Sequence, residues 1–306
     1  MKKRPPKDIA ASVRQRLQNN ARETSRPFQE VLQYFAMERF LYRLSQSPHA
    51  DRFILKGALM LAAWHAPASR PTRDIDFLAR MENTVEAILP VIRDVCKQPV
   101  EPDGLVFDEE SIAGVIIKED ADYEGVRVTF RAHLQNARVP MQIDMGFGDV
   151  VFPAAVQTDY PTILDYPAPR LRAYSRETAV AEKFEAMTKL GQLNSRMKDF
   201  FDIWLLSRQF DFDGLTLASA VEKTFANRKT PIDPKLVALT SGFAEEPTKV
   251  TQWRGFLRKS RLENAPQELG QVVDALAAFL LPIAEALSES QPFDQFWKAP
   301  GNWQAR

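Results

Sequence analysis

Two aspartates spaced two positions apart, Asp74 and Asp76, are the residues of this sequence best suited to chemistry. They lie in the run Thr72-Arg-Asp-Ile-Asp-Phe, which predicts a β-strand, so both carboxylates should point to one face of it. Upstream, Phe53-Ile-Leu-Lys-Gly-Ala predicts a short strand, a turn at Gly57 and the start of a helix. Paired carboxylates beside a glycine turn and a helix N-terminus can hold a divalent cation next to a phosphate. This combination indicates nucleotide chemistry.

A third carboxylate, Asp144, lies in another apolar strand segment, Gln142-Ile-Asp-Met. A lone aspartate at a strand end is ordinarily part of a turn or an ion pair. Three buried acids close together are costly unless a cation neutralises them. The glycine turn upstream therefore favours a metal site over separate structural roles. That site would consist of Asp74, Asp76 and Asp144.

A second group of charged residues follows later in the chain, in segments that predict helices. It comprises Lys183, Lys198, Asp199 and Asp202, the last two of which share a helix face by their i, i+3 spacing. These charges lie next to aromatic residues expected in the core, as the walls of a cleft often do. Two amphipathic helices whose charges face water would explain this pattern equally well.

Composition limits the classes of protein that fit. The 306 residues suffice for one large domain or two ordinary ones, and 45% apolar with 26% charged residues is usual for a soluble globular protein. The net charge is zero, so attraction to nucleic acid must come from local patches. The single cysteine excludes an internal disulfide, and the three histidines lack metal-ligand spacing. With no signal core and no apolar run approaching a membrane span, we expect a cytoplasmic protein.

Apolar periodicity predicts an α+β chain. The predicted strands are 53–55, 73–79, 112–118, 124–132 and 138–145. They should form a mixed sheet in which the later strands are antiparallel. Pro140 indicates that the last of them begins at an edge or carries a bulge. The predicted helices are 8–24, 27–45 with Pro27 at its first position, 84–98, 176–191, 196–209, 214–226, 249–258 and 266–288. We expect an extended proline-rich connector over 151–173 and a tail, 290–306, that packs back on the body.

Three segments are basic enough to contact nucleic acid. Residues 1–26 hold eight Lys or Arg against two acids, although a solvated helix face explains this equally well. The others are the Arg228-Lys229 pair and the stretch from Arg254 to Arg261.

In combination these segments resemble the AbiEii/AbiGii nucleotidyltransferase toxin family, the toxin half of type IV toxin–antitoxin systems. The resemblance covers roughly residues 8–210, and beyond them the match is to a generic helical domain. It rests on five motifs in order: Phe53-Ile-Leu-Lys-Gly-Ala, Thr72-Arg-Asp-Ile-Asp-Phe, Ile143-Asp144, Ala181-Glu-Lys-Phe-Glu-Ala and Arg196-Met-Lys-Asp-Phe-Phe-Asp-Ile.

The resemblance implies a DNA polymerase β-like nucleotidyltransferase core with N-terminal helices and a C-terminal helical domain. The expected division is residues 1–50, 51–160 and 161–306. It implies that Mg²⁺ binds at Asp74, Asp76 and Asp144, and that Lys183 reaches the triphosphate. Asp199 or Asp202 matches a further acidic motif, and either could be the catalytic one. The implied nucleotide-binding residues are Lys56, Gly57, Ala58, Thr72, Lys183 and Lys198.

The implied activity is transfer of NMP from an NTP to RNA, with the tRNA 3′ end as acceptor, which would block translation. A cognate antitoxin and no membrane partner are implied as well. The superfamily usually has Gly-Ser or Gly-Gly where this sequence has Gly57-Ala58, so a hydroxyl contact to phosphate is missing. Three alternatives stay open: a metal-dependent nuclease, an antitoxin-binding module that has lost catalysis, and nucleotidylation of a protein hydroxyl.

Overall fold

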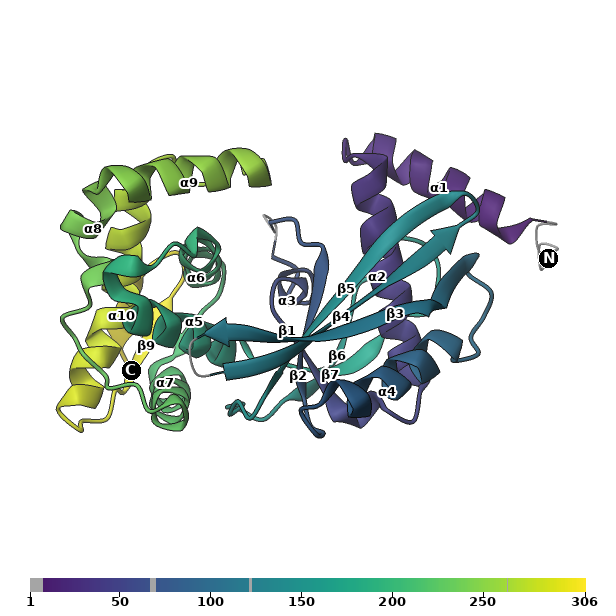
Figure 1. Cartoon of the computed structure of the whole chain (residues 1–306). Helices are drawn as coiled ribbons and strands as arrows, with labels where there is room; N and C mark the ends of the chain where they lie inside the picture. Colours follow the sequence, from purple (N-terminus) through teal and green to yellow (C-terminus); the bar gives the residue numbers. More distant parts are fainter. Residues whose placement is uncertain (1–7, 67–69, 121–122, 263) are drawn as a thin grey trace. The chain divides into compact units, whose positions relative to one another are not determined.

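The computed structural model describes residues 8–66, 70–120, 123–262 and 264–306 (Figure 1). Contacts divide the chain into two compact units. The first unit consists of Met1–Trp64, Thr72–Gly148 and Val156–Ala173. The second unit consists of His65–Pro71, Asp149–Ala155 and Tyr174–Arg306. Each is described by itself below.

The first unit is built on a seven-stranded mixed sheet with the order β3-β4-β5-β2-β1-β7-β6. β3, β4 and β5 form an antiparallel meander, β2 runs parallel to β5, and β1 pairs antiparallel with β2 and parallel with β7. The strands are β1 Phe53–Lys56, β2 Asp74–Ala79, β3 Leu105–Asp120, β4 Tyr123–Leu134, β5 Ala137–Phe147, β6 Val156–Asp159 and β7 Arg170–Ala173. The predicted mixed sheet with antiparallel later strands is confirmed.

Three helices of the first unit contribute to the core that covers one face of this sheet: α1 Ile9–Glu23, α2 Phe28–Gln46 and α4 Val85–Lys97. Alternate residues of the central strands, such as Ile75, Phe77 and Ile143, join the same hydrophobic core as the helices. The residues between them, including both aspartates of β2, therefore point to the opposite face. The sheet thus separates an apolar face from a face that carries charge.

Most predicted elements of this unit are confirmed, although β3 spans Leu105–Asp120 where the sequence predicts a strand only over 112–118. Pro27 is the N-cap of α2 and not its first helical residue. Pro140 lies in β5, a central strand, but β2 begins to pair only opposite Gln142. At Pro140 the strand therefore has β4 alone as a neighbour, which is the edge environment that a residue without N–H requires.

The segment 151–173 is not simply an extended connector, since β6 and β7 form there and extend the sheet. Each has only four residues, and Leu171 and Ala173 of β7 are buried while their neighbours are more exposed. Strands this short leave little periodic signal in the sequence.

The second unit is mainly helical. Its helices are α5 Arg176–Leu190, α6 Met197–Gln209, α7 Gly214–Arg228, α8 Ser241–Glu245, α9 Pro247–Ser260 and α10 Leu269–Ser288. The short helix α3, Leu59–Ala63, follows β1 in the first unit, and 3₁₀ turns occur at Ala50–Arg52, Gly191–Leu193 and Val237–Leu239. Five predicted helices are confirmed here, while α8, with only five residues, is missed.

The tail packs back as predicted and does so as a sheet. β8 Phe212–Asp213, β9 Gln295–Lys298 and β10 Asn302–Ala305 form three antiparallel strands. The Trp297 and Trp303 rings contact Phe279 of α10, at 4.7 and 5.7 Å between centroids. These aromatic contacts hold the tail on the helices.

The expectation that no apolar run approaches a membrane span is wrong for α10. This helix has 20 residues and a mean hydropathy of 1.5 over its most apolar window, which meets the length and composition of a span. Its apolar face nevertheless packs inside the second unit, with Leu276, Phe279 and Leu280 fully buried. These are the contacts of a core helix.

Candidate active site

A row of four charged residues crosses the sheet of the first unit on the face opposite the helices. Register pairs Lys56 of β1 with Asp76 of β2, Asp76 with Asp144 of β5, and Asp144 with Arg127 of β4. Residues directly opposite each other in a sheet share a face, so the row reads cation, carboxylate, carboxylate, cation. The two acids at its centre are thus flanked by positive charge on both sides.

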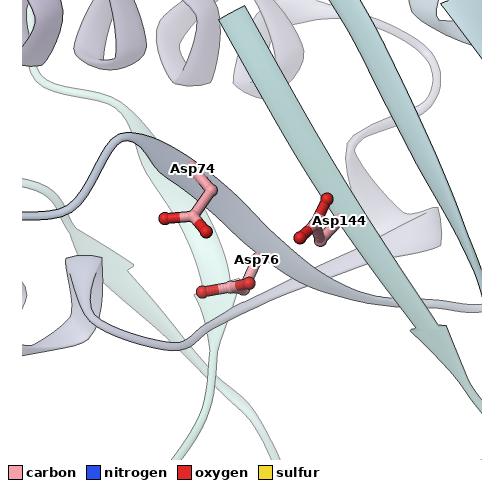
Figure 2. A group of neighbouring side chains, drawn as sticks. All are labelled: Asp74, Asp76 and Asp144. Atoms are coloured by element: carbon pink, nitrogen blue, oxygen red, sulfur yellow. The ribbon is translucent and has the colours of Figure 1, made fainter. Parts of the chain in front are cut away.

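Asp74 completes a cluster of three carboxylates at the centre of this row (Figure 2). One oxygen from each of Asp74, Asp76 and Asp144 lies within 4.8 Å of the other two. Oxygen-only donor sets of this kind suit Mg²⁺, Mn²⁺ or Ca²⁺ rather than softer metals. The predicted gathering of these acids is confirmed, and the residues present fit a divalent cation.

Thr72 orients the first of the three acids. Its hydroxyl donates a hydrogen bond to Asp74 Oδ1, and its backbone N–H donates to the Tyr34 hydroxyl at 2.9 Å. Thr72 is buried, so this contact is shielded from water. The hydroxyl that the resemblance placed beside the metal pair therefore contacts a carboxylate of the cluster in this structure. Its predicted contact to nucleotide stays a prediction.

Arg127 is a site residue that the sequence analysis missed. Its Nε and Nη2 donate to the two oxygens of Asp144 at 2.8 and 2.7 Å, and Gln142 Nε2 donates to Asp144 Oδ2 at 3.2 Å. The hydrogen bonds to Asp144 raise the pKa of the Arg127 guanidinium, and the charges of Asp74 and Asp76 act in the same direction. The only signal in the sequence is an arginine between buried Val126 and Val128.

Gly57 has two reasons to be glycine. Its φ of +73° lies in the left-handed region, which other residues adopt only at a cost. A Cβ at this position would also lie 2.6 Å from Asp76 Cγ, well inside van der Waals contact. The turn thus brings the backbone against a carboxylate of the acidic cluster. The helix α3, which begins after Ala58, has only five residues. We therefore expect the backbone of the turn to contribute more to phosphate binding than the dipole of this helix.

We expect Gly57→Ala to impair both folding and cation binding. Left-handed strain costs about 1 kcal/mol, and relief of the clash must displace the Asp76 side chain. Thermal unfolding and Mn²⁺ titration of the variant measure the two effects. Gly191→Ala is the control, because Gly191 also has positive φ (47°) but nothing within 4 Å of its would-be Cβ. Gly57→Ala that binds Mn²⁺ like the control would show that the turn is unrelated to the cluster.

The second predicted group forms an ion-pair network inside the second unit. Lys183 Nζ lies 2.6 Å from Asp199 Oδ1 and 2.9 Å from Asp202 Oδ2. Arg70 donates to both oxygens of Asp202 at 2.8 and 3.0 Å, a partner that the sequence analysis missed. Both aspartates are buried, which rules out the alternative of charges that face water.

The electrostatics of this network favour its charged form. Burial alone would raise the pKa of Asp202, but Arg70 and Lys183 outweigh it and lower that pKa to about 2. Burial alone would lower the pKa of Lys183, and the two carboxylates outweigh it and raise that pKa. Lys183 is therefore cationic at neutral pH. Lys198, by contrast, lies on the exposed side of α6, and its predicted nucleotide contact stays a prediction.

Arg228 is not available to nucleic acid, so this part of the predicted basic surface is wrong. Its side chain is 11% exposed, and its guanidinium lies 2.8 Å from Asp149 Oδ1 and 2.9 Å from Glu185 Oε2. Burial would lower the pKa of Arg228, but the surrounding acids, Glu182 first among them, raise it. These ion pairs lie inside the second unit, where they tie helices α5 and α7 to the segment 149–155.

A mixed sheet that gathers three carboxylates beside a glycine turn is typical of a metal-dependent enzyme that acts on phosphates. The family comparison makes this class specific. A family model described as nucleotidyl transferase AbiEii toxin, type IV TA system, matches residues 39–280. The chain therefore belongs to the AbiEii nucleotidyltransferase toxin family, and membership implies an NTP substrate and a cognate antitoxin.

Two solved structures from Helicobacter pylori are similar to this chain. JHP933 is 17% identical, with a TM-score of 0.49 and coverage of 86% of this chain and 94% of its own. A presumed nucleotidyltransferase is 16% identical, with a TM-score of 0.47 and coverage of 86% of this chain and 98% of its own. A search of curated proteins finds no match.

Proposed function

We propose that this toxin transfers a nucleoside monophosphate from an NTP to the 3′ end of an RNA, with tRNA as the acceptor, in the cytoplasm. The observation that carries the proposal is the cluster of Asp74, Asp76 and Asp144, whose oxygens lie within 4.8 Å of one another between two cations. Such a cluster concentrates negative charge that a divalent cation would balance, and the same cation would bind the phosphates of an NTP.

The proposed reaction is a nucleophilic displacement at the α-phosphorus of the NTP. The RNA hydroxyl forms a bond to the α-phosphorus, the bond to the β-phosphate oxygen breaks, and pyrophosphate leaves; the hydroxyl proton passes to a carboxylate or to water. Asp74, Asp76 and Asp144 would hold Mg²⁺, which when bound supplies activation of the hydroxyl and neutralisation of the leaving group. Lys56 is in register beside Asp76 and buried, so it offers a fixed positive charge to the phosphates.

Lys183 would stabilise the triphosphate as a second cation, as the resemblance implies. Its ammonium is held between Asp199 and Asp202, so its position is set before substrate arrives. The same contacts offset its charge, and Arg70 compensates by taking both oxygens of Asp202. In this proposal Asp199 and Asp202 orient Lys183.

Incubation of the protein with each α-labelled NTP and total tRNA tests the proposal. Label on tRNA that is lost with EDTA supports transfer, and the preferred NTP is the one that gives most label. Shortened RNA without label would instead indicate a nuclease, and label on protein would indicate nucleotidylation of a protein hydroxyl. The absence of all three products would indicate a binding module.

The basic face of α9 is our candidate for the surface that holds RNA. Residues 247–261 contain no acid, and Arg254, Arg258, Lys259 and Arg261 are exposed. Arg254 and Arg258 are one helical turn apart, while Trp253 and Leu257, on an adjacent side of the helix, are buried. Rows of cations at this spacing contact successive phosphates and position RNA without reading its sequence.

Replacing Arg254 and Arg258 together by alanine is therefore expected to weaken tRNA binding and to flatten its salt dependence. The slope of log K against log salt should fall by about 0.7 to 0.9 for each lost phosphate contact. Fluorescence anisotropy over a salt series measures both quantities. Lys223→Ala with Lys235→Ala removes the same charge from the same unit and should leave the slope unchanged. Equal slopes in all three proteins would remove α9 from the RNA surface.

A further inference from the structure

Arg127 forms hydrogen bonds with Asp144, a carboxylate that a cation in the cluster would bind. Both oxygens of Asp144 accept hydrogen bonds from this one guanidinium, and Asp144 is one of the three acids of the cluster. With Gln142 Nε2 as a third donor, these hydrogen bonds fill three of the about four lone-pair positions of the carboxylate, and a cation at the remaining position would lie close to the positive guanidinium. Arg127 and a divalent cation therefore compete for the same oxygens.

Arg127 is considerably more exposed than the carboxylate that it contacts. Its side chain is 38% exposed, whereas that of Asp144 is 10% exposed. Asp144 would remain oriented after the release, since Gln142 Nε2 still donates to its Oδ2 at 3.2 Å. The backbone pairing of β4 with β5 continues on both sides of the pair and does not depend on it.

A released guanidinium beside this cluster has an evident second partner. The planar fork of arginine that fits a carboxylate bidentately also fits a phosphate bidentately. A triphosphate held through a cation on the three aspartates would lie on the sheet face that also carries Arg127, directly beside Asp144. When Asp144 binds a cation, Arg127 loses its negatively charged partner, and a phosphate of the substrate then replaces that partner.

We propose that Arg127 is a positioning residue that stands in for the cation at Asp144 and moves from this carboxylate to a substrate phosphate when metal and nucleotide bind. The phosphate part rests on the proposed function, while the competition for Asp144 does not. Two consequences follow. Binding of a divalent cation without nucleotide should be weak, and nucleotide should strengthen it because Arg127 then gains a new partner.

Mn²⁺ titration followed by electron paramagnetic resonance tests both consequences. We expect Arg127→Gln to bind Mn²⁺ without nucleotide at least about tenfold more tightly, because a unit charge a few ångströms away is removed and Asp144 is freed. Addition of non-hydrolysable analogues of the four NTPs should then strengthen Mn²⁺ binding less in Arg127→Gln than in the parent protein.

Arg131→Gln is the matched control. Arg131 lies four residues further along β4, on the same face of the strand, and pairs with Asp108 at 3.1 Å instead of a cluster residue. Its replacement removes the same charge and should leave Mn²⁺ affinity unchanged. Arg127→Lys keeps the charge but loses the fork, so it should bind Mn²⁺ between the parent protein and Arg127→Gln.

The proposal is overturned if Arg127→Gln, shown to be folded by its melting curve, binds Mn²⁺ as the parent does or more weakly. Arg127 would then only support the orientation of Asp144. If Arg127→Gln fails to fold, the Arg127→Lys titration decides: affinity equal to the parent overturns the competition. Tighter nucleotide-free binding with no response to any NTP analogue would retain the competition and count against the proposed NTP substrate.

Discussion

Nucleotidyl transfer is expected to fall at least about a thousandfold in Asp76→Asn, with the fold retained. Asp76 lies between Lys56 and Asp144 in the charged row, and one of its oxygens lies within 4.8 Å of an oxygen of Asp74 and of Asp144. Asparagine keeps the volume but removes the charge that holds a cation, and a loss of about 4 kcal/mol of transition-state stabilisation corresponds to this factor. Label transferred to tRNA measures it.

The stability of the same variant separates catalysis from folding. Neutralisation of Asp76 relieves its repulsion of Asp74 and Asp144 but also removes a negative charge beside buried Lys56, so the two effects offset and the melting temperature should change little. Asp159→Asn is the control: it removes an exposed aspartate of β6 in the same unit and should leave transfer intact. Asp76→Asn that retains transfer would exclude the cluster as the metal site.

The acidic cluster could be predicted because its members lie in locally periodic segments. Asp74 and Asp76 are two apart in an apolar strand, and Asp144 occupies the equivalent alternate position in another. Alternation specifies the face on which each side chain lies. It does not specify register, which arises from pairing of distant segments, so the direct pairing of Asp76 with Asp144 is known only from the structure.

The residues that were missed all act through contacts with other segments of the chain. Arg127 becomes a site residue because β4 lies beside β5 in a register that places it opposite Asp144. Arg70 reaches Asp202 across 132 positions of sequence. Arg228 was misassigned for the same reason, because the acids that surround it belong to other segments. A single sequence contains no local signal for such contacts.

Short strands are the other part of the fold that remained hidden. β7 has four residues after a proline-rich segment and is stabilised by pairing with β1 and β6. β9 and β10 likewise depend on each other and on aromatic contacts to α10. Strands that owe their structure to their neighbours show weak intrinsic preference, whereas α2 and α5 carry enough apolar residues to be recognised alone.

Lys183→Ala is expected to lower kcat/KM for the NTP by about a hundredfold, the loss typical of removing one preorganised charge from a transition state. The variant has a second effect that must be separated. Asp199 and Asp202 are both buried, and Asp199 loses its only partner shown above, so the fold should be destabilised as well. Transfer kinetics at several NTP concentrations and thermal unfolding measure the two effects.

The double variant Lys183→Ala with Asp199→Asn distinguishes a catalytic lysine from a structural one. It removes the buried carboxylate together with its cation, and Arg70 still neutralises Asp202, so most of the lost stability should return. If Lys183 acts on the triphosphate, kcat/KM stays low in this stable protein. Lys189→Ala, an exposed lysine on the same helix, should behave as the parent. Recovery of transfer together with stability would assign Lys183 to the fold alone, because a catalytic charge cannot be restored by deleting its counterion.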